Sequence, residues 1–272
     1  MQRFLGLLVC LTALSLRAQT LMPLAQSDAR TKALVERVTN AYGGAERLAR
    51  IHSMFTTAQT TSVTMHSLYV LPDRVWMRVD GKTRTWFVVT PLAAWIKSNE
   101  IPSGAAMKMP DEDRNNLLAP IEIEPLLVIA HRNFSTTRFA AGESRIVNGV
   151  TIDTLLVRVR QFDAKWSIDA NGHVLSVARG ELTTDYEDWR AVQGINVPFK
   201  SNARLPNGER QSITLVSCEF DRTVDEAKLF DTPKFWYDPK IDLAKTWDPF
   251  LDISRGFFIY RGQAWQVVTY GH

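Results

Sequence analysis

Short stretches in which apolar and polar side chains alternate, separated by turn dipeptides, constrain the fold more than any other feature of this sequence. In Arg74–Asp80, for example, Val75, Met77 and Val79 occupy every second position, as they would on one face of a β-strand. Pairs such as Asn148-Gly149 favour tight hairpin turns. Because neighbouring stretches follow one another with no helix between them, they predict antiparallel hairpins rather than parallel crossover units.

These stretches predict about eleven strands and a mainly β protein of the α+β class. The strands are expected within Met54–Thr61, Ser62–Leu71, Arg74–Asp80, Thr83–Thr90, Ala93–Lys97, Ser144–Val147, Thr151–Gln161, Ala164–Asp169, His173–Gly180, Glu181–Trp189, Ile195–Leu205 and Glu209–Phe220.

An N-terminal helix is predicted before the first strand. Apolar residues recur with helical period from Leu34 to Tyr42, Ser27 or Asp28 can cap the helix, and Gly43-Gly44 ends it.

A helical insert divides the strands into two groups. It follows an expected loop at Ile101–Met109 and begins with Asp111–Leu118, which Pro120 is expected to break. A second, wholly apolar helix can open at Pro125.

Residues 1–18 have the features of a secretory signal peptide: a basic start at Arg3, an apolar run over Phe4–Leu16, and small Ala18, after which we expect cleavage. The run spans about 13 residues, fewer than the roughly 20 that a membrane-spanning helix needs. The sequence therefore predicts export to the periplasm. Cleavage removes Cys10, so Cys218 has no disulfide partner and is expected to be a small buried residue on a strand.

Composition and motifs exclude several classes of function. With 32 basic and 29 acidic residues, the net charge of +3 gives no reason to expect a nucleic-acid partner. The sequence has no HExxH, CxxC, GxSxG or P-loop motif, so we expect no metal, no cofactor and no catalytic residues. The acids Asp185, Glu187 and Asp188 are better interpreted as a solvated strand end than as a cation site.

Three stretches resemble a known family. They are Tyr42–Leu48 with Ile51, Asp188–Phe199 with its Val-Gln-Gly and Pro-Phe pairs, and Val224–Phe230 followed by Pro233. Their order and spacing over residues 28–233 are similar to the outer-membrane lipoprotein-sorting protein superfamily (LolA/LolB-like). The resemblance implies that residues 19–233 form a half-barrel domain, in which a strongly curved antiparallel sheet makes an unclosed barrel. The N-terminal helix and the helical insert would then lie over its concave face.

Residues 234–272 lie outside this pattern and form an aromatic-rich C-terminal extension. We expect the extension to pack on the sheet or to add to its edge. It is a candidate docking segment for a protein partner in the cell envelope.

The resemblance also implies an apolar cavity between the concave face and the helices, which in carrier members takes up lipoprotein acyl chains. The expected lining residues are Val75, Met77, Val79, Phe87, Val89, Leu126, Leu127, Ile129, Leu155, Val157 and Val159. Such side chains suit a lipid, since each buried CH₂ contributes about 0.8 kcal/mol. Without the resemblance, the residues favour a filled core. Trp76, between Arg74 and Arg78 on the opposite strand face, could hold an anionic head group, but a half-exposed sheet residue is the interpretation we favour.

The main hypothesis is a periplasmic, non-enzymatic carrier or binder of a lipid-like ligand, either a lipoprotein acyl chain or another hydrophobic molecule. The alternative is a structural or interaction module of the cell envelope with a filled core and no ligand. An enzyme whose active site assembles only in space is a third possibility, and no motif supports it.

Overall fold

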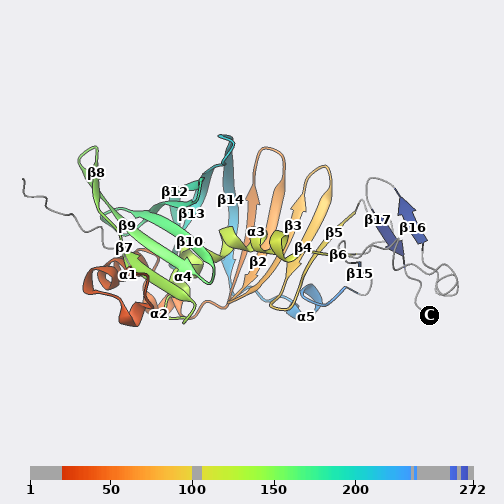
Figure 1. Cartoon of the computed structure of the whole chain (residues 1–272), viewed down its shortest axis with the longest axis horizontal. Coiled ribbons are helices and arrows are strands. Elements are labelled where there is room, and N and C mark those ends of the chain that lie inside the picture. Colours follow the sequence, from red (N-terminus) through yellow and green to blue (C-terminus); the bar gives the residue numbers. More distant parts are fainter. Residues whose placement is uncertain (1–19, 100–105, 234–235, 238–257, 262–264, 269–272) are drawn as a thin grey trace, which may run out of the picture.

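The alternating stretches form one large sheet in the computed structural model, which describes residues 20–99, 106–233, 236–237, 258–261 and 265–268 (Figure 1). Its strands are β1 (Ser53–Gln59), β2 (Thr64–Val70), β3 (Arg74–Asp80), β4 (Arg84–Val89), β5 (Ala94–Ser98), β6 (Ala106–Lys108), β7 (Thr137–Ala141), β8 (Arg145–Val147), β9 (Val150–Val159), β10 (Phe162–Ile168), β11 (Val174–Arg179), β12 (Leu182–Val192), β13 (Ile195–Arg204), β14 (Arg210–Phe220) and β15 (Trp236–Tyr237). A separate pair is formed by β16 (Phe258–Arg261) and β17 (Trp265–Val268).

The order across the sheet is β15-β6-β5-β4-β3-β2-β1-β14-β13-β12-β11-β10-β9-β7, with β8 paired to β9 beside this path. Consecutive strands pair as antiparallel hairpins in two groups, β1–β6 and β9–β14, and the pairing of β1 with β14 joins the groups. Only β15 pairs in parallel, with β6, among the described strands. Since β15 and β7 are left as edges, the sheet stays open, and the predicted mainly β, unclosed architecture is confirmed.

The sheet contains more strands than predicted: β15 lies in the aromatic extension, and two other short strands, β6 and β7, carry no alternation. β6 has three residues and lies within the expected loop Ile101–Met109, where its pairing with β5 defines it. β7 was assigned no element. Four of its five residues are buried, so both faces meet protein and the sequence Thr-Arg-Phe-Ala-Ala shows no two-residue period.

Helices cover one face of the sheet. Near the N-terminus they are a 3₁₀ turn, η1 (Leu24–Gln26), then α1 (Ala29–Ala41) and α2 (Ala45–Leu48). The insert consists of α3 (Asp111–Glu122) and α4 (Pro125–Ala130), and α5 (Glu226–Leu229) follows the last long strand. In Figure 1, α3 lies across the middle of the sheet, in front of β14 and β2. Among the described residues, no helix is both long and apolar enough to cross a bilayer.

The helix ends follow from local chemistry, with one exception. Asp28 caps α1, since its Oδ1 accepts a 2.7 Å hydrogen bond from the Thr31 N–H. The prediction that Pro120 breaks the first insert helix is wrong, because α3 continues to Glu122. Proline removes one backbone donor, and the Ile123 N–H bonds the Ala119 carbonyl immediately afterwards, so the last turn persists. Pro125 then occupies the first turn of α4.

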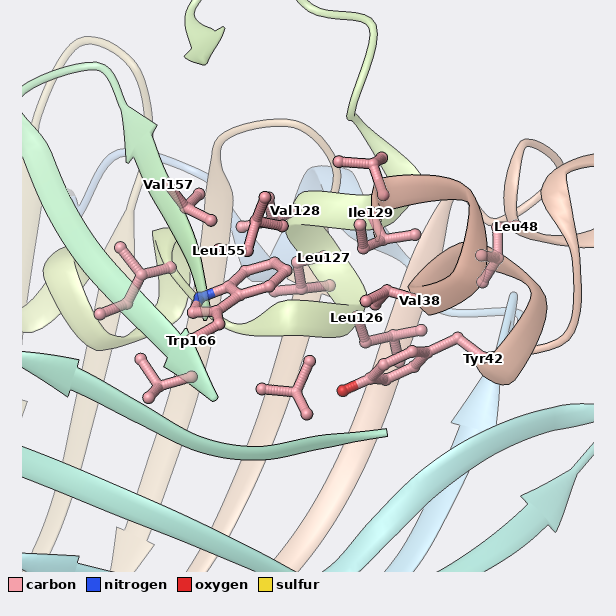
Figure 2. Packing of buried hydrophobic residues seen from close by; sticks show 14 of the residues in the cluster. Val38, Tyr42, Leu48, Leu126, Leu127, Val128, Ile129, Leu155, Val157 and Trp166 are labelled. Atoms are coloured by element: carbon pink, nitrogen blue, oxygen red, sulfur yellow. The ribbon is translucent and has the colours of Figure 1, made fainter. Parts of the chain in front are cut away.

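The main hydrophobic core lies between α1, α4 and the strands from β7 to β11, and it extends to α2, β1, β13 and β14. Figure 2 shows Trp166 of β10 and Tyr42 pointing toward the apolar side chains of α4. Leu126, Leu127, Val128 and Ile129 are all buried, because α4 is enclosed by α1 on one side and the sheet on another. This half of the molecule is a filled core.

Candidate functional site

An apolar cavity of about 430 Å³ lies between the middle of the sheet and the helical insert. Strands from both groups contribute to its wall: Met54, Thr56, Ala58, Met65, Ser67, Tyr69, Met77, Val177, Arg179, Leu182, Thr184, Tyr186, Val197, Pro198, Phe199, Ser201, Ile213 and Leu215. The insert covers it with Leu117, Ile121, Ile123, Glu124, Leu126 and Leu127. The volume falls within the roughly 300–1,000 Å³ typical of small-molecule sites.

Strand alternation and register bring the wall together. Every second residue of β1 faces the cavity, and the register places Thr56 opposite Ser67 and Ala58 opposite Met65 on β2. The β12 strand contributes Tyr186 in the same way. Because β1 and β14 pair at the centre of the sheet, one cavity receives side chains from segments far apart in the sequence.

Among the described residues that line the cavity, only Glu124 is acidic and only Arg179 is basic. Glu124 lies in the turn between α3 and α4, where its Oε2 accepts a 2.8 Å hydrogen bond from the Tyr186 hydroxyl. Burial raises the pKa of Glu124 to about 7, and the Tyr186 hydrogen bond opposes part of that rise. At neutral pH a substantial share of Glu124 is therefore protonated inside the apolar cavity.

Tyrosines surround this carboxyl group. Burial is the main cause that raises the pKa of Tyr42 and Tyr186 well above the ordinary value, and the charge of Glu124 adds to it. The buried Tyr42 hydroxyl has no hydrogen-bond partner among the described residues. In the cavity wall, the Glu124 carboxyl group therefore contacts a tyrosine hydroxyl group rather than a basic side chain.

A smaller pocket of about 60 Å³ lies on the other side of Tyr69 and Leu127, which line both spaces. Its polar end is occupied by protein charges, since Arg160 contacts Glu122 at 2.9 Å and Asp73 at 3.9 Å. A space of this size holds a few water molecules rather than a lipid.

All the predicted lining residues except Val79 fall into four groups. Met77, Leu126 and Leu127 line the large cavity. Val75 and Val159 line the small pocket. Ile129, Leu155 and Val157 are buried in the main core. Val89 and Phe87 belong to a second small core cluster, and half-buried Val79 lies opposite Met65 in the sheet register.

Sequence reasoning did not select most of the cavity wall, above all the residues from β11 to β14. One signal was present: Leu182, Thr184 and Tyr186 alternate and therefore share a face. Alternation alone could not show that this face meets a helix across an open space. Ligand binding by any of these residues stays a prediction.

The other candidate sites contain groups that bind one another. Arg74 contacts Glu226 at 2.8 Å, and Arg78 contacts Asp80 at 3.0 Å, so the arginines beside half-buried Trp76 have protein partners. No group of three or more His, Cys, Asp or Glu residues in the described part of the chain is arranged to hold a metal ion.

Two of the three residues of the acidic cluster are likewise paired. Glu187 contacts Lys200 at 3.0 Å, and Asp188 contacts Arg190 at 2.6 Å. Cys218 lies buried in β14, as predicted, and burial raises the pKa of its thiol to about 12.

No family model matches the sequence, and no curated protein matches it. Solved structures with a similar fold include a candidate outer membrane lipoprotein-sorting protein domain from Vibrio parahaemolyticus (10% identity, 74% of this chain and 96% of that chain, TM-score 0.49). A DUF1329 family protein from Desulfovibrio piger is 8% identical over 73% of this chain and 96% of that chain, with a TM-score of 0.50. A LolA superfamily protein from Nitrosomonas europaea is 11% identical over 72% and 96%, with a TM-score of 0.49.

At these identities the likeness is one of fold alone. The predicted architecture, a large open antiparallel sheet with helices over one face, is confirmed, and the DUF1329 protein has a similar fold.

Proposed function

We propose that this protein is a periplasmic, non-enzymatic carrier or binder of a lipid-like ligand, held in the cavity between the sheet and the insert. The single observation that carries the proposal is the cavity itself: about 430 Å³, walled mainly by apolar side chains, and bounded on one side by the filled core. The names of the Vibrio and Nitrosomonas proteins agree with a role in lipoprotein sorting, and we extend that role to this chain only as part of the proposal.

The cavity wall can supply the free energy for binding a chain. Burial of ten CH₂ groups would contribute about 8 kcal/mol. Translational and conformational costs of association offset part of this gain, so micromolar or weaker affinity is the expectation. Methionines at positions 54, 65 and 77 add adaptable contacts, which suit a flexible ligand better than a rigid one.

Native mass spectrometry of protein purified from a periplasm tests the proposal. A carrier is expected to contain a bound molecule with a mass of a few hundred daltons or more. This molecule should dissociate on collisional activation in the spectrometer and should be extractable into organic solvent. A variant with the cavity filled, Ala58→Phe, should lose this mass while keeping its circular dichroism spectrum. Wild-type protein free of such mass, which also takes up no added fatty acid, would contradict the proposal.

An interaction module is the second candidate, and one observation favours it. The β8–β9 hairpin presents Ile146, Val147 and Val150 to solvent, and Ile146 is 76% exposed. Apolar tips of this kind often contact another protein. The aromatic extension that was expected to dock a partner lies mostly outside the described residues, apart from the β16–β17 pair and β15, which adds to the sheet edge beside β6. Pull-down of a protein that depends on the hairpin, with no lipid bound, would support this candidate instead.

A further inference from the structure

We propose that Arg179 binds the head group of the ligand, and that the ligand is a single-chain amphiphile with one anionic head group, a carboxylate or a phosphate. This inference rests on the proposed function, because it assumes that the cavity takes up an apolar chain. It adds the chemical class of the ligand and its orientation: the tail lies in the cavity, and the head group lies at the end of β11.

Arg179 occupies the position where the cavity wall reaches a turn. It is the last residue of β11 and pairs with Leu182, the first residue of β12. Both residues line the cavity, whereas Gly180 and Glu181 between them are exposed. Since alternate residues of a strand share a face, the half-buried Arg179 faces the same side as buried Val177. Its apolar stem can cover the wall while the guanidinium group stays near water.

Arg179 has no counter-ion among the described residues, unlike Arg158 and Arg190 of the same sheet. Arg158 on β9 makes two bonds to Asp163, at 2.5 and 2.8 Å. Arg190 on β12 makes two to Asp188, at 3.0 and 2.6 Å. Within the part of the chain that the structure describes, the Arg179 side chain has no hydrogen bond and no ion pair.

An unpaired cation in a partly apolar site favours an anion from outside. A half-buried guanidinium group loses hydration, and a hydrogen-bonded anion restores the lost interactions. The planar guanidinium group presents paired N–H donors that match the two oxygens of a carboxylate or a phosphate. A neutral ester or an alcohol offers no such match.

Glu124 does not neutralise Arg179. Its carboxyl group is held in the turn between α3 and α4 and accepts the Tyr186 hydroxyl, and no ion pair joins it to Arg179. The rest of the cavity wall is formed mainly by apolar side chains, among them Leu215 and Leu127. This arrangement suits a molecule with one charged end and one long apolar chain.

Fluorescent ligands of equal chain length test the inference. Purified full-length protein is titrated with a pyrene-labelled fatty acid, its methyl ester and the corresponding alkyl phosphate. We expect wild-type protein to bind the acid or the phosphate roughly tenfold more tightly than the ester, as hydrogen bonds to a charged group predict. The tighter of the two anions identifies the head group.

Two variants locate the effect. Arg179→Gln should lower the affinity for the anionic probe roughly tenfold and leave the ester unchanged. Arg204→Gln is the matched control, because Arg204 is exposed and pairs with Thr183, whose face of β12 is opposite to that of the cavity-lining Leu182 and Thr184. It should bind all three probes as wild-type protein does.

The outcomes separate this inference from the proposed function. Equal affinity of wild-type protein for acid, phosphate and ester would overturn the head-group site and leave the lipid carrier standing. An equal loss of affinity for the anionic probe in Arg179→Gln and Arg204→Gln would also overturn the head-group site. The net charge of the protein would then explain the preference for anions. If no probe binds wild-type protein, the proposed function fails too. Should Arg179→Gln melt early, Arg179→Lys replaces it, and it is expected to keep the preference for the anion.

Discussion

A carboxylate introduced at Met77 distinguishes an open cavity from a filled core. Met77 lies on β3, where the register places it between Ser67 on β2 and Phe87 on β4, and its half-buried side chain lines the cavity. In Met77→Glu the new carboxylate can remain hydrated by water in the cavity. The expected cost in unfolding free energy is therefore about 1 kcal/mol, mainly lost apolar contact.

The same change in the filled core is the control. Leu155 is fully buried on β9 against Trp166 and α4, so no water can reach a carboxylate there. Burial of an unpaired charge costs several kcal/mol, which is comparable to the roughly 5–15 kcal/mol that holds a domain folded. Leu155→Glu should therefore fail to accumulate as soluble protein.

Thermal melts and titration with a fluorescent fatty acid measure both effects. Met77→Glu should melt within a few degrees of wild-type protein and lose most of its affinity for the acid, because the new charge displaces apolar contact and repels the anion. If Met77→Glu unfolds as readily as Leu155→Glu, the space beside Met77 is filled and the reasoning is refuted. If it folds and binds the acid as before, the ligand lies elsewhere.

Three further predictions follow from the titrating groups and the N-terminus. The folded-state pKa of Glu124, about 7, lies above its ordinary value of 4.5, so the native state holds its proton more firmly than the unfolded chain. The stabilisation from this protonated carboxyl group is complete below about pH 4.5 and is lost as pH rises toward 7. Glu124→Gln should therefore remove on the order of 3 kcal/mol from the pH dependence of the unfolding free energy, measured by chemical denaturation. An unchanged pH dependence in this variant would be evidence against a buried carboxyl group. Cys218, 7% exposed and with its thiol pKa raised to about 12, should resist a thiol reagent at pH 8 until the protein unfolds, and rapid labelling of native protein would contradict its burial. N-terminal sequencing of protein from the periplasm should begin near Gln19; Met1 in cytoplasmic protein would remove the predicted compartment.

The sequence predicted strands better than it predicted the space between them. Alternation in Arg74–Asp80 assigned each side chain to a face, and β3 has the predicted bounds. The same reasoning grouped Met77 with Leu155, although one lines a cavity and the other lies in a filled core. What separates them is long-range packing: α1 and α4 fill the space over β9 and β10, while α3 spans the central strands without filling the space beneath it. Local periodicity contains no information about how closely a helix packs on the strands that it covers.

The sequence analysis did not predict the polar residues of the cavity, for a related reason. Glu124 stands next to Pro125 in a turn, and turns usually expose their carboxylates to solvent. Its burial depends on Tyr186, which is 62 positions away in the sequence and reaches it only because the sheet curves beneath the insert. Arg179 ends a strand, where an exposed charge is the ordinary expectation. Its place on the cavity wall follows from the β11–β12 register.

Photoaffinity labelling with a fatty acid that carries a diazirine in its chain tests the central claim most directly, because it reports where the chain lies. After irradiation and digestion, the cavity account predicts labels on the peptides that contain Met65, Phe199 and Leu215, and on the insert near Leu127, all of them suppressed by excess unlabelled acid. Saturable labelling confined to the β8–β9 hairpin around Ile146, with none on the cavity wall, would contradict it.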